Sequence, residues 1–158
     1  MKLVADNGPR LLKICRVYAW SRPDQDDLYQ EMLFQLWRAL PNLREASHAD
    51  TWLYRIALNT AISWTRKQDR HKRGKQPLEI ADCLLTAPEA EADPRVEWLY
   101  RQIAQLKDVD RAVALLMLDG FAYKEITAIV GISESNVGVK INRIKAALTA
   151  QLAKESES

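Results

Sequence analysis

Polar and cationic side chains recur along residues 51–67 at the spacing of one helix face. They are Arg55, Asn59, Ser63 and Arg66, with Trp52 in the same arc and Lys67 beside them. Arginine binds phosphate, an amide pairs with a base edge, and an indole stacks on an unpaired base. This pattern indicates non-covalent binding of nucleic acid. If Trp52 instead starts the core of its helix, Arg55 and Arg66 are ordinary surface residues.

A second candidate surface lies on an expected helix over residues 134–152. Val137, Ile141, Ile144 and Leu148 repeat at helical spacing and predict its buried stripe. The side chains that then face outward are Ser135, Asn136, Val139, Lys140, Asn142 and Arg143. A short turn, 131–133, joins this helix to an expected helix over 123–130. Gly131 suits the end of the first helix and Ser133 suits the cap of the second.

Two helices joined by a short turn that contains glycine are typical of a helix-turn-helix. The second helix of such a motif enters the major groove of DNA with its N-terminal half. The outward set on 134–152 combines short hydrogen-bonding side chains with cations, which favours this interpretation. The alternative is an amphipathic helix in a purely structural bundle.

A third candidate surface lies on an expected helix over residues 26–40. Its apolar half collects Leu28, Tyr29, Met32, Leu33, Leu36, Trp37 and Leu40. Phe34 lies in the opposite half among Asp27, Gln30, Glu31, Gln35 and Arg38. An aromatic side chain surrounded by polar groups is typical of an anchor for a partner protein. A single exposed apolar residue is also common on protein surfaces.

The charge pattern divides these helices between two domains. Residues 66–75 hold six Lys or Arg against one Asp, whereas 76–94 hold five acidic residues, three prolines and no Lys or Arg. Low periodicity with three prolines predicts an extended linker. We expect helical domains over 8–70 and 93–153, joined by a flexible linker over 71–92. No segment alternates with period two, so the expected fold is all-α, with a helix-turn-helix in the C-terminal domain.

Composition excludes several classes of protein. With 47% hydrophobic and 28% charged residues among 158, the chain can bury a core, which argues against wholesale disorder. The longest apolar run, 112–118, is far shorter than the ~20 residues of a membrane-spanning helix. The N-terminus lacks the apolar stretch of a secretory signal. We therefore expect a cytoplasmic protein without membrane insertion.

Catalytic and metal-binding patterns are missing from the sequence. Cys15 and Cys83 lie far apart, and neither His48 nor His71 is near them, which indicates neither a disulfide framework nor a metal site. No catalytic triad, P-loop or GxGxxG motif is present. We expect no enzymatic activity and no cofactor.

Three segments together resemble a known family. They are 27–37, 51–61 and 120–126, which read DLYQEMLFQLW, TWLYRIALNTA and GFAYKEI. In content, order and spacing they are similar to short bacterial RNA polymerase sigma factors of the extracytoplasmic-function (ECF) type. The resemblance covers nearly the whole chain except the linker and both tails. It implies a two-domain factor that binds core RNA polymerase and directs promoter recognition and DNA melting.

The resemblance also implies a role for each surface. The helix over 26–40 would dock on the clamp of the largest polymerase subunit through Asp27, Gln30, Glu31, Phe34 and Arg38. Proximal promoter DNA would be bound and melted by Ser47, His48, Trp52, Arg55, Asn59, Ser63, Arg66 and Lys67. The distal promoter element would be recognised by Ser135, Asn136, Val139, Lys140, Asn142 and Arg143. Further expected partners are the polymerase flap and an anti-sigma factor.

The chain departs from the family pattern at two places. The loop over 43–49 lacks the glycine and aromatic residue often found there, and Gly138, Val139 and Lys140 occupy positions where many members carry a polar and basic run. Two rival classes also follow from the sequence. A stand-alone helix-turn-helix regulator would bind a palindrome without polymerase, and a nucleic-acid enzyme would cleave its substrate with a divalent ion.

Overall fold

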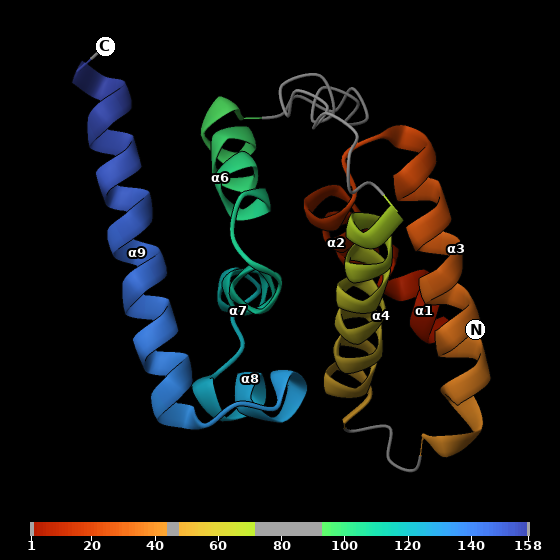
Figure 1. Ribbon diagram of the computed structural model, residues 1–158. Coiled ribbons are helices and arrows are strands. Elements are labelled where there is room, and N and C mark those ends of the chain that lie inside the picture. The colour runs from red at the N-terminus through yellow and green to blue at the C-terminus, as the bar shows by residue number, and fades with distance from the viewer. Residues whose placement is uncertain (1, 44–47, 72–92, 158) are drawn as a thin grey trace. The chain divides into compact units, whose positions relative to one another are not determined.

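The computed structural model describes residues 2–43, 48–71 and 93–157 (Figure 1). Within these ranges the regular structure is entirely helical, without a strand, which confirms the all-α prediction. The chain forms two compact units, Met1–Ala104 and Gln105–Ser158, called here the first and second units. The linker predicted over 71–92 lies outside the described residues, except for the last residue of α4.

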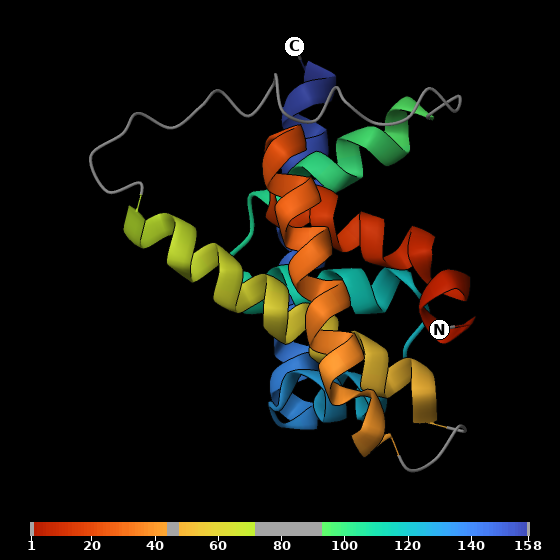
Figure 2. The ribbon, with the colours of Figure 1, turned by 90° about the vertical axis from the view of Figure 1, so that its right-hand side faces the viewer.

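The first unit is built around three helices that pack against one another. α2 (Gly8–Tyr18), α3 (Arg22–Ala39) and α4 (Ala49–His71) contact each other, and α3 crosses α4 (Figure 2). The short α1 (Lys2–Asp6) precedes α2, and a 3-10 turn (Leu40–Asn42) follows α3. The largest fully buried side chains of this core are Leu11, Ile14, Leu28, Met32, Leu36, Leu53, Tyr54 and Leu58.

Local chemistry explains where α3 begins and which stripe it buries. The Ser21 hydroxyl accepts a hydrogen bond from the Asp24 backbone N–H at 3.2 Å, and proline occupies the first turn. Leu28, Met32 and Leu36 repeat every four residues and are buried. The prediction that Trp37 is a core residue is wrong, because its side chain is 64% exposed. The buried stripe of α3 is therefore narrower than the apolar half of the helix predicted from the sequence.

α4 is longer than predicted, and its inner face matches the prediction. The sequence pattern predicts Asp50 as its N-cap and an end near residue 67. In the structure α4 spans Ala49–His71, and Asp50 lies within its first turn. The sequence pattern predicts an inward face made of Leu53, Tyr54, Ala57, Leu58, Ala61 and Trp64. The first five are buried and Trp64 is half-buried. The opposite face of α4 is therefore available to solvent, and its residues form the first candidate site below.

In the sequence, Asp93 followed by Pro94 predicts an N-cap with proline at the first helical position. α6 (Pro94–Ala104) begins there, with Asp93 as its cap. The Arg95 backbone N–H donates to Asp93 Oδ1 at 2.9 Å, and the hydrogen bonds from Arg95 lower the pKa of the Asp93 carboxyl. Glu97 forms an ion pair with Arg16 of α2 at 3.1 Å. By these contacts α6 lies in the first unit. The proposed start of the second domain at residue 93 stays a prediction.

The second unit contains the predicted helix-turn-helix. α7 (Asp108–Leu118) and α8 (Tyr123–Val130) pack against α9 (Glu134–Glu157). Gly131 ends α8 with a φ of 81°, a left-handed conformation that favours glycine, and donates its N–H to the Thr127 carbonyl at 2.9 Å. The Ser133 hydroxyl caps α9 by accepting from the Asn136 backbone N–H at 3.1 Å. Both local predictions are confirmed.

The core of the second unit fixes which side of α9 faces outward. Val137, Ile141 and Ile144 are buried against α7 and α8, and Leu148 is half-buried. Burying each of the first three stabilises the unit by about 1.5–3 kcal/mol. The opposite side of the N-terminal half of α9 is thereby held toward solvent.

Candidate nucleic-acid interfaces and docking surface

The outer side of α4 carries the proximal set predicted from the sequence. Its exposed members, called the α4 face, are Arg55, Asn59, Ser63, Arg66 and Lys67. Trp52 is half-buried at the start of the same helix, and His48 is exposed just before it. Ser47 lies outside the described residues. The structure thus brings most of the predicted set onto one continuous helical surface.

A groove of about 740 Å³ runs between α3 and α4 beside this face. Asn59, Ser63, Arg66 and Lys67 contribute to one side, and Glu31 and Gln35 contribute from α3. Gln35 Nε2 donates to Glu31 Oε1 at 3.0 Å. The groove therefore places the predicted DNA-binding residues next to residues of the predicted docking surface.

Arg70 and Thr60 also line this groove, and neither was among the predicted site residues. Arg70 continues the cationic edge one turn beyond Arg66 and Lys67 and is exposed. Its position within the basic run 66–75 was the available signal. No feature of the sequence pointed to Thr60. In the structure its hydroxyl donates to the Ile56 carbonyl at 2.7 Å within the helix.

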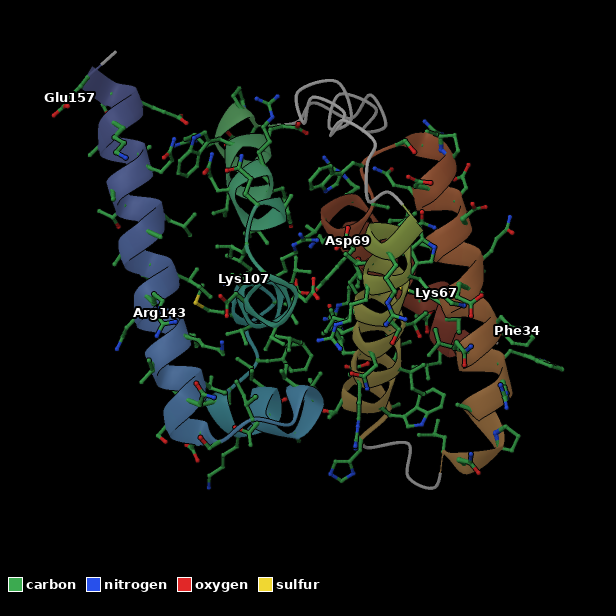
Figure 3. All side chains as sticks on the ribbon, in the orientation of Figure 1. Phe34, Lys67, Asp69, Lys107, Arg143 and Glu157 are labelled. Atoms are coloured by element: carbon green, nitrogen blue, oxygen red, sulfur yellow. The ribbon has the colours of Figure 1, made fainter. Side chains whose placement is uncertain are left out.

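The docking surface predicted on α3 is exposed throughout. This surface, called the α3 face, consists of five exposed residues: Asp27, Gln30, Glu31, Phe34 and Arg38. Phe34 is 51% exposed and projects from the helix (Figure 3). Trp37, one turn along, is more exposed still, so two large aromatic side chains lie on the outside of α3.

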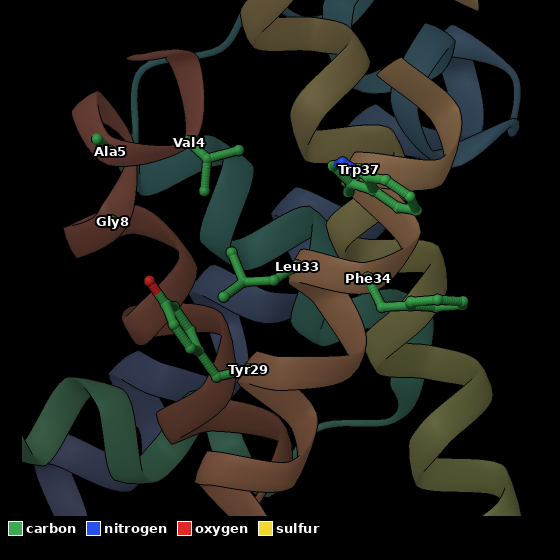
Figure 4. Close-up of a pocket in the computed structure, with 7 residues that line it drawn as sticks. All are labelled: Val4, Ala5, Gly8, Tyr29, Leu33, Phe34 and Trp37. Atoms are coloured by element: carbon green, nitrogen blue, oxygen red, sulfur yellow. The ribbon is translucent and has the colours of Figure 1, made fainter. Parts of the chain in front are cut away.

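An apolar hollow of about 530 Å³ adjoins these aromatic rings. It is lined by Val4, Ala5, Gly8, Tyr29, Leu33, Phe34 and Trp37. Tyr29 and Leu33 point toward α1 and the start of α2, whereas the rings of Phe34 and Trp37 point away from them (Figure 4). Sequence reasoning missed the contribution of Trp37, since helical periodicity placed it with the core.

The α9 side chains predicted to bind the distal element divide into two groups. Ser135, Asn136, Val139, Asn142 and Arg143 are exposed and form the α9 face. Lys140 is half-buried, because its Nζ donates to Asp110 Oδ1 of α7 at 2.8 Å and each side chain is only 20% exposed. The structure brings five of the six predicted residues together and turns Lys140 toward α7.

The described residues hold no group of three or more His, Cys, Asp or Glu that could bind a metal ion. Cys15 is buried in the first unit. Burial raises the pKa of its thiol to about 12, with a smaller contribution from the nearby Asp26 carboxylate, so Cys15 stays protonated near neutral pH. None of the helices in the described ranges has the length and apolar character needed to span a membrane.

Comparison with known families matches both parts of the chain. The model described as Sigma-70 region 2 matches residues 3–71, which include α2, α3 and α4. The model described as Sigma-70, region 4 matches residues 96–148, which include most of α6 and the helix-turn-helix. Together they cover well over half of the sequence.

Characterised relatives support the same assignment. The ECF RNA polymerase sigma-E factor of Escherichia coli (strain K12) is 31% identical over 137 residues, covering 79% of this chain and 72% of that protein. RNA polymerase sigma factor CnrH of Cupriavidus metallidurans is 28% identical over 172 residues, covering 99% of this chain and 87% of that protein.

Two solved structures share the fold. The sigma factor RpoE, in complex with the anti-sigma factor NepR from Bartonella quintana, has a TM-score of 0.79 and 20% identity, covering 95% of this chain and 94% of that one. CnrH in complex with the cytosolic domain of CnrY has a TM-score of 0.65 and 26% identity, covering 97% and 86%. The family models and the sigma-E relatives therefore show that this chain belongs to the sigma-70 family and is an ECF sigma factor that directs promoter use, not a stand-alone regulator.

Proposed function

We propose that the α3 face docks on the clamp of core RNA polymerase. The support is the exposed Phe34 among acidic and amide side chains, beside a hollow that adjoins Trp37. Aromatic residues at the centre of a polar rim carry much of the binding energy of protein interfaces. Asp27 and Glu31 would favour a basic partner surface by charge complementarity.

The α4 face, together with the groove beside it, binds and opens the proximal promoter element. Arg55, Arg66, Lys67 and Arg70 supply positive charge for phosphates, while Asn59 and Ser63 supply hydrogen bonds to bases. Unstacking a base step costs a few kcal/mol, and contacts to an exposed base return about 1–3 kcal/mol. A surface that holds the separated strand can therefore stabilise the open state without nucleotide hydrolysis.

The α9 face recognises the distal promoter element in the major groove. The observation that carries the whole proposal is that two compact units of one chain each expose a polar and cationic helix face. Each face alone is small, and the formal net charge of the chain is only +2. Binding to polymerase would hold both faces in place at once. Once one face is bound to DNA, the other has a high effective concentration near its own site, which strengthens the overall binding.

The flap of polymerase and an anti-sigma factor are further proposed partners. The similar solved sigma factors were captured with NepR or with the cytosolic domain of CnrY, which supports an inhibitor for this chain as well. Covering the α3 face or either DNA face would be sufficient for inhibition. We place the protein in the cytoplasm, where core polymerase acts, and assign it no catalytic activity and no cofactor.

Reconstituted transcription on fragmented genomic DNA tests this function. Purified core polymerase plus the full chain should produce run-off transcripts from asymmetric promoters, and core polymerase alone should not produce them. Identical transcripts with and without the chain would contradict the proposal. Specific binding of a palindrome without polymerase would contradict it too, and divalent-ion-dependent cleavage of DNA would overturn the non-catalytic assignment.

A further inference from the structure

Val139 stands out on the α9 face by its chemistry. It is 54% exposed, and it is the one apolar member of a face that otherwise holds hydroxyl, amide and guanidinium groups. Ser135 and Asn136 lie one turn before it, and Asn142 and Arg143 lie one turn after it. Val139 therefore occupies the centre of the face.

The packing of α9 keeps the Val139 side chain at the outermost point. Its neighbours along the chain, Gly138 and Lys140, are both half-buried. A Cβ at Gly138 would lie 3.7 Å from Tyr123 Cε2, so that flank approaches α8. On the other flank, the Lys140 ion pair with Asp110 ties α9 to α7. Both flanks of Val139 thus turn toward the body of the second unit.

The buried stripe confirms this orientation. Val137 and Ile141, two residues to either side of Val139, are at most 1% exposed. Residues two apart on an α-helix point about 200° from each other. Val139 consequently faces away from the core, and no core contact accounts for its apolar character. Helix stability does not account for it either, because a β-branched residue is a weaker helix former than alanine.

The major groove offers one feature that an alkyl side chain recognises directly. Each base pair presents hydrogen-bond donors and acceptors there, which valine cannot satisfy, and thymine adds a C5-methyl group. An apolar side chain at the centre of a recognition face can bury that methyl group while polar neighbours bind the adjoining base edges. At base pairs next to such a thymine, the Arg143 guanidinium can pair with guanine and the Asn136 amide can pair with adenine.

We propose that Val139 recognises the methyl group of a thymine in the distal promoter element. The inference rests on the proposed DNA-binding function of the α9 face and deepens it by naming the base. Lys140 has no part in this contact; it acts as a positioning residue that holds α9 on α7.

The test uses polymerase holoenzyme containing the full chain and a promoter recovered by the transcription experiment above. Each thymine of the distal element is replaced singly by deoxyuridine, which lacks only the methyl group. For the wild-type chain, one replacement should weaken binding about fourfold, as expected for loss of one buried methyl contact. With Val139→Ala, thymine and deoxyuridine at that position should bind equally.

Leu152→Ala provides a matched control. Leu152 is 55% exposed and lies on the same helix, but beyond the α9 face. This variant should keep the full response to deoxyuridine, and Val139→Ala should fold normally because alanine is the better helix former at an exposed site.

Two results would overturn the inference in distinguishable ways. If scrambling the distal element changes affinity, but no thymine shows a response that Val139→Ala removes, the methyl contact is wrong and the distal function stands. If scrambling the distal element leaves affinity unchanged, the proposed function of the α9 face fails, and the inference fails with it.

Discussion

The α4 face and the α9 face are both exposed sides of helices, but they differ in how many Lys and Arg side chains are exposed. On α4, Arg55, Arg66 and Lys67 are all exposed along one edge. On α9, Lys140 is drawn into an ion pair with Asp110 of α7, and Arg143 remains exposed. The first surface is a cationic edge beside a groove, whereas the second is a compact patch of short polar groups around a valine.

This difference suits two kinds of DNA contact. A cationic edge beside a groove can follow a flexible, separated strand, which requires charge and space more than exact donor placement. A compact patch on a helix held by a rigid core suits the fixed donor and acceptor pattern of duplex DNA. We infer that the first unit stabilises open DNA and the second unit selects the site. The following predictions test that division.

The largest effect is expected on the α4 face. Combining Asn59→Ala with Arg66→Ala should reduce promoter opening about thirtyfold, because each residue removed weakens the hold on the separated strand. Recruitment to duplex promoter DNA should change much less. Permanganate footprinting measures opening, and a binding assay measures recruitment. Arg22→Ala, which removes an exposed arginine of the same unit outside the α4 face, is the control. Equal losses in opening and recruitment would contradict the assignment.

A loss of similar size is expected at the docking surface. Phe34→Ala should weaken binding to core polymerase about thirtyfold, the effect of losing one central aromatic anchor, without changing the melting temperature. Leu12→Ala is the matched control, because Leu12 is 50% exposed on α2 of the same unit. Trp37→Ala sharpens the result, since a comparable loss would extend the surface to both rings. Unchanged affinity for Phe34→Ala would show that polymerase binds elsewhere.

The ion pair of the second unit should affect stability and leave selectivity intact. Lys140→Ala or Asp110→Ala should lower the free energy of unfolding by about 1–2 kcal/mol, because each leaves a partly buried partner unpaired. The double variant should lose less than the sum. Arg143→Ala should instead weaken distal-element binding at unchanged stability. Urea unfolding and holoenzyme binding separate the two effects. If Lys140→Ala changed promoter preference at full stability, Lys140 would have to contact DNA together with the α9 face.

The smallest effect is expected next to Val139. Gly138→Ala should raise the free energy of unfolding by about 0.5–1 kcal/mol, because Gly138 is helical and alanine is the better helix former. The new methyl group would meet Tyr123 at 3.7 Å, an ordinary contact. Thermal unfolding measures this gain. Destabilisation would show that α8 and α9 approach each other more closely than the structure indicates.

Local rules predicted the elements well. Gly131 and Ser133 specify the helix-turn-helix by backbone conformation and capping, which depend on a few neighbouring residues. The cap of α6 at Asp93 followed from the same kind of reasoning. Periodicity also located the buried stripes of α4 and α9, since apolar residues there repeat regularly.

The errors arose where distant residues decide the outcome. Periodicity placed Trp37 in the core, but α3 meets its neighbours along a narrow stripe that one helix alone does not reveal. The ion pair of Lys140 was not foreseen, because its carboxylate partner, Asp110, lies on another helix. The assignment of Lys140 to DNA stays a prediction. Which face of the chain binds polymerase or DNA stays a prediction, because exposure and charge allow binding without specifying the partner.

Transcription from a promoter that is already melted tests the division between the two units most directly. The template carries mismatched strands across the proximal element, and the enzyme is core polymerase with wild-type or variant chains. From this division of roles we expect pre-melting to restore transcription by the Asn59→Ala, Arg66→Ala double variant but not by Arg143→Ala. Rescue of Arg143→Ala, or failure to rescue the double variant while its polymerase affinity is normal, would contradict it.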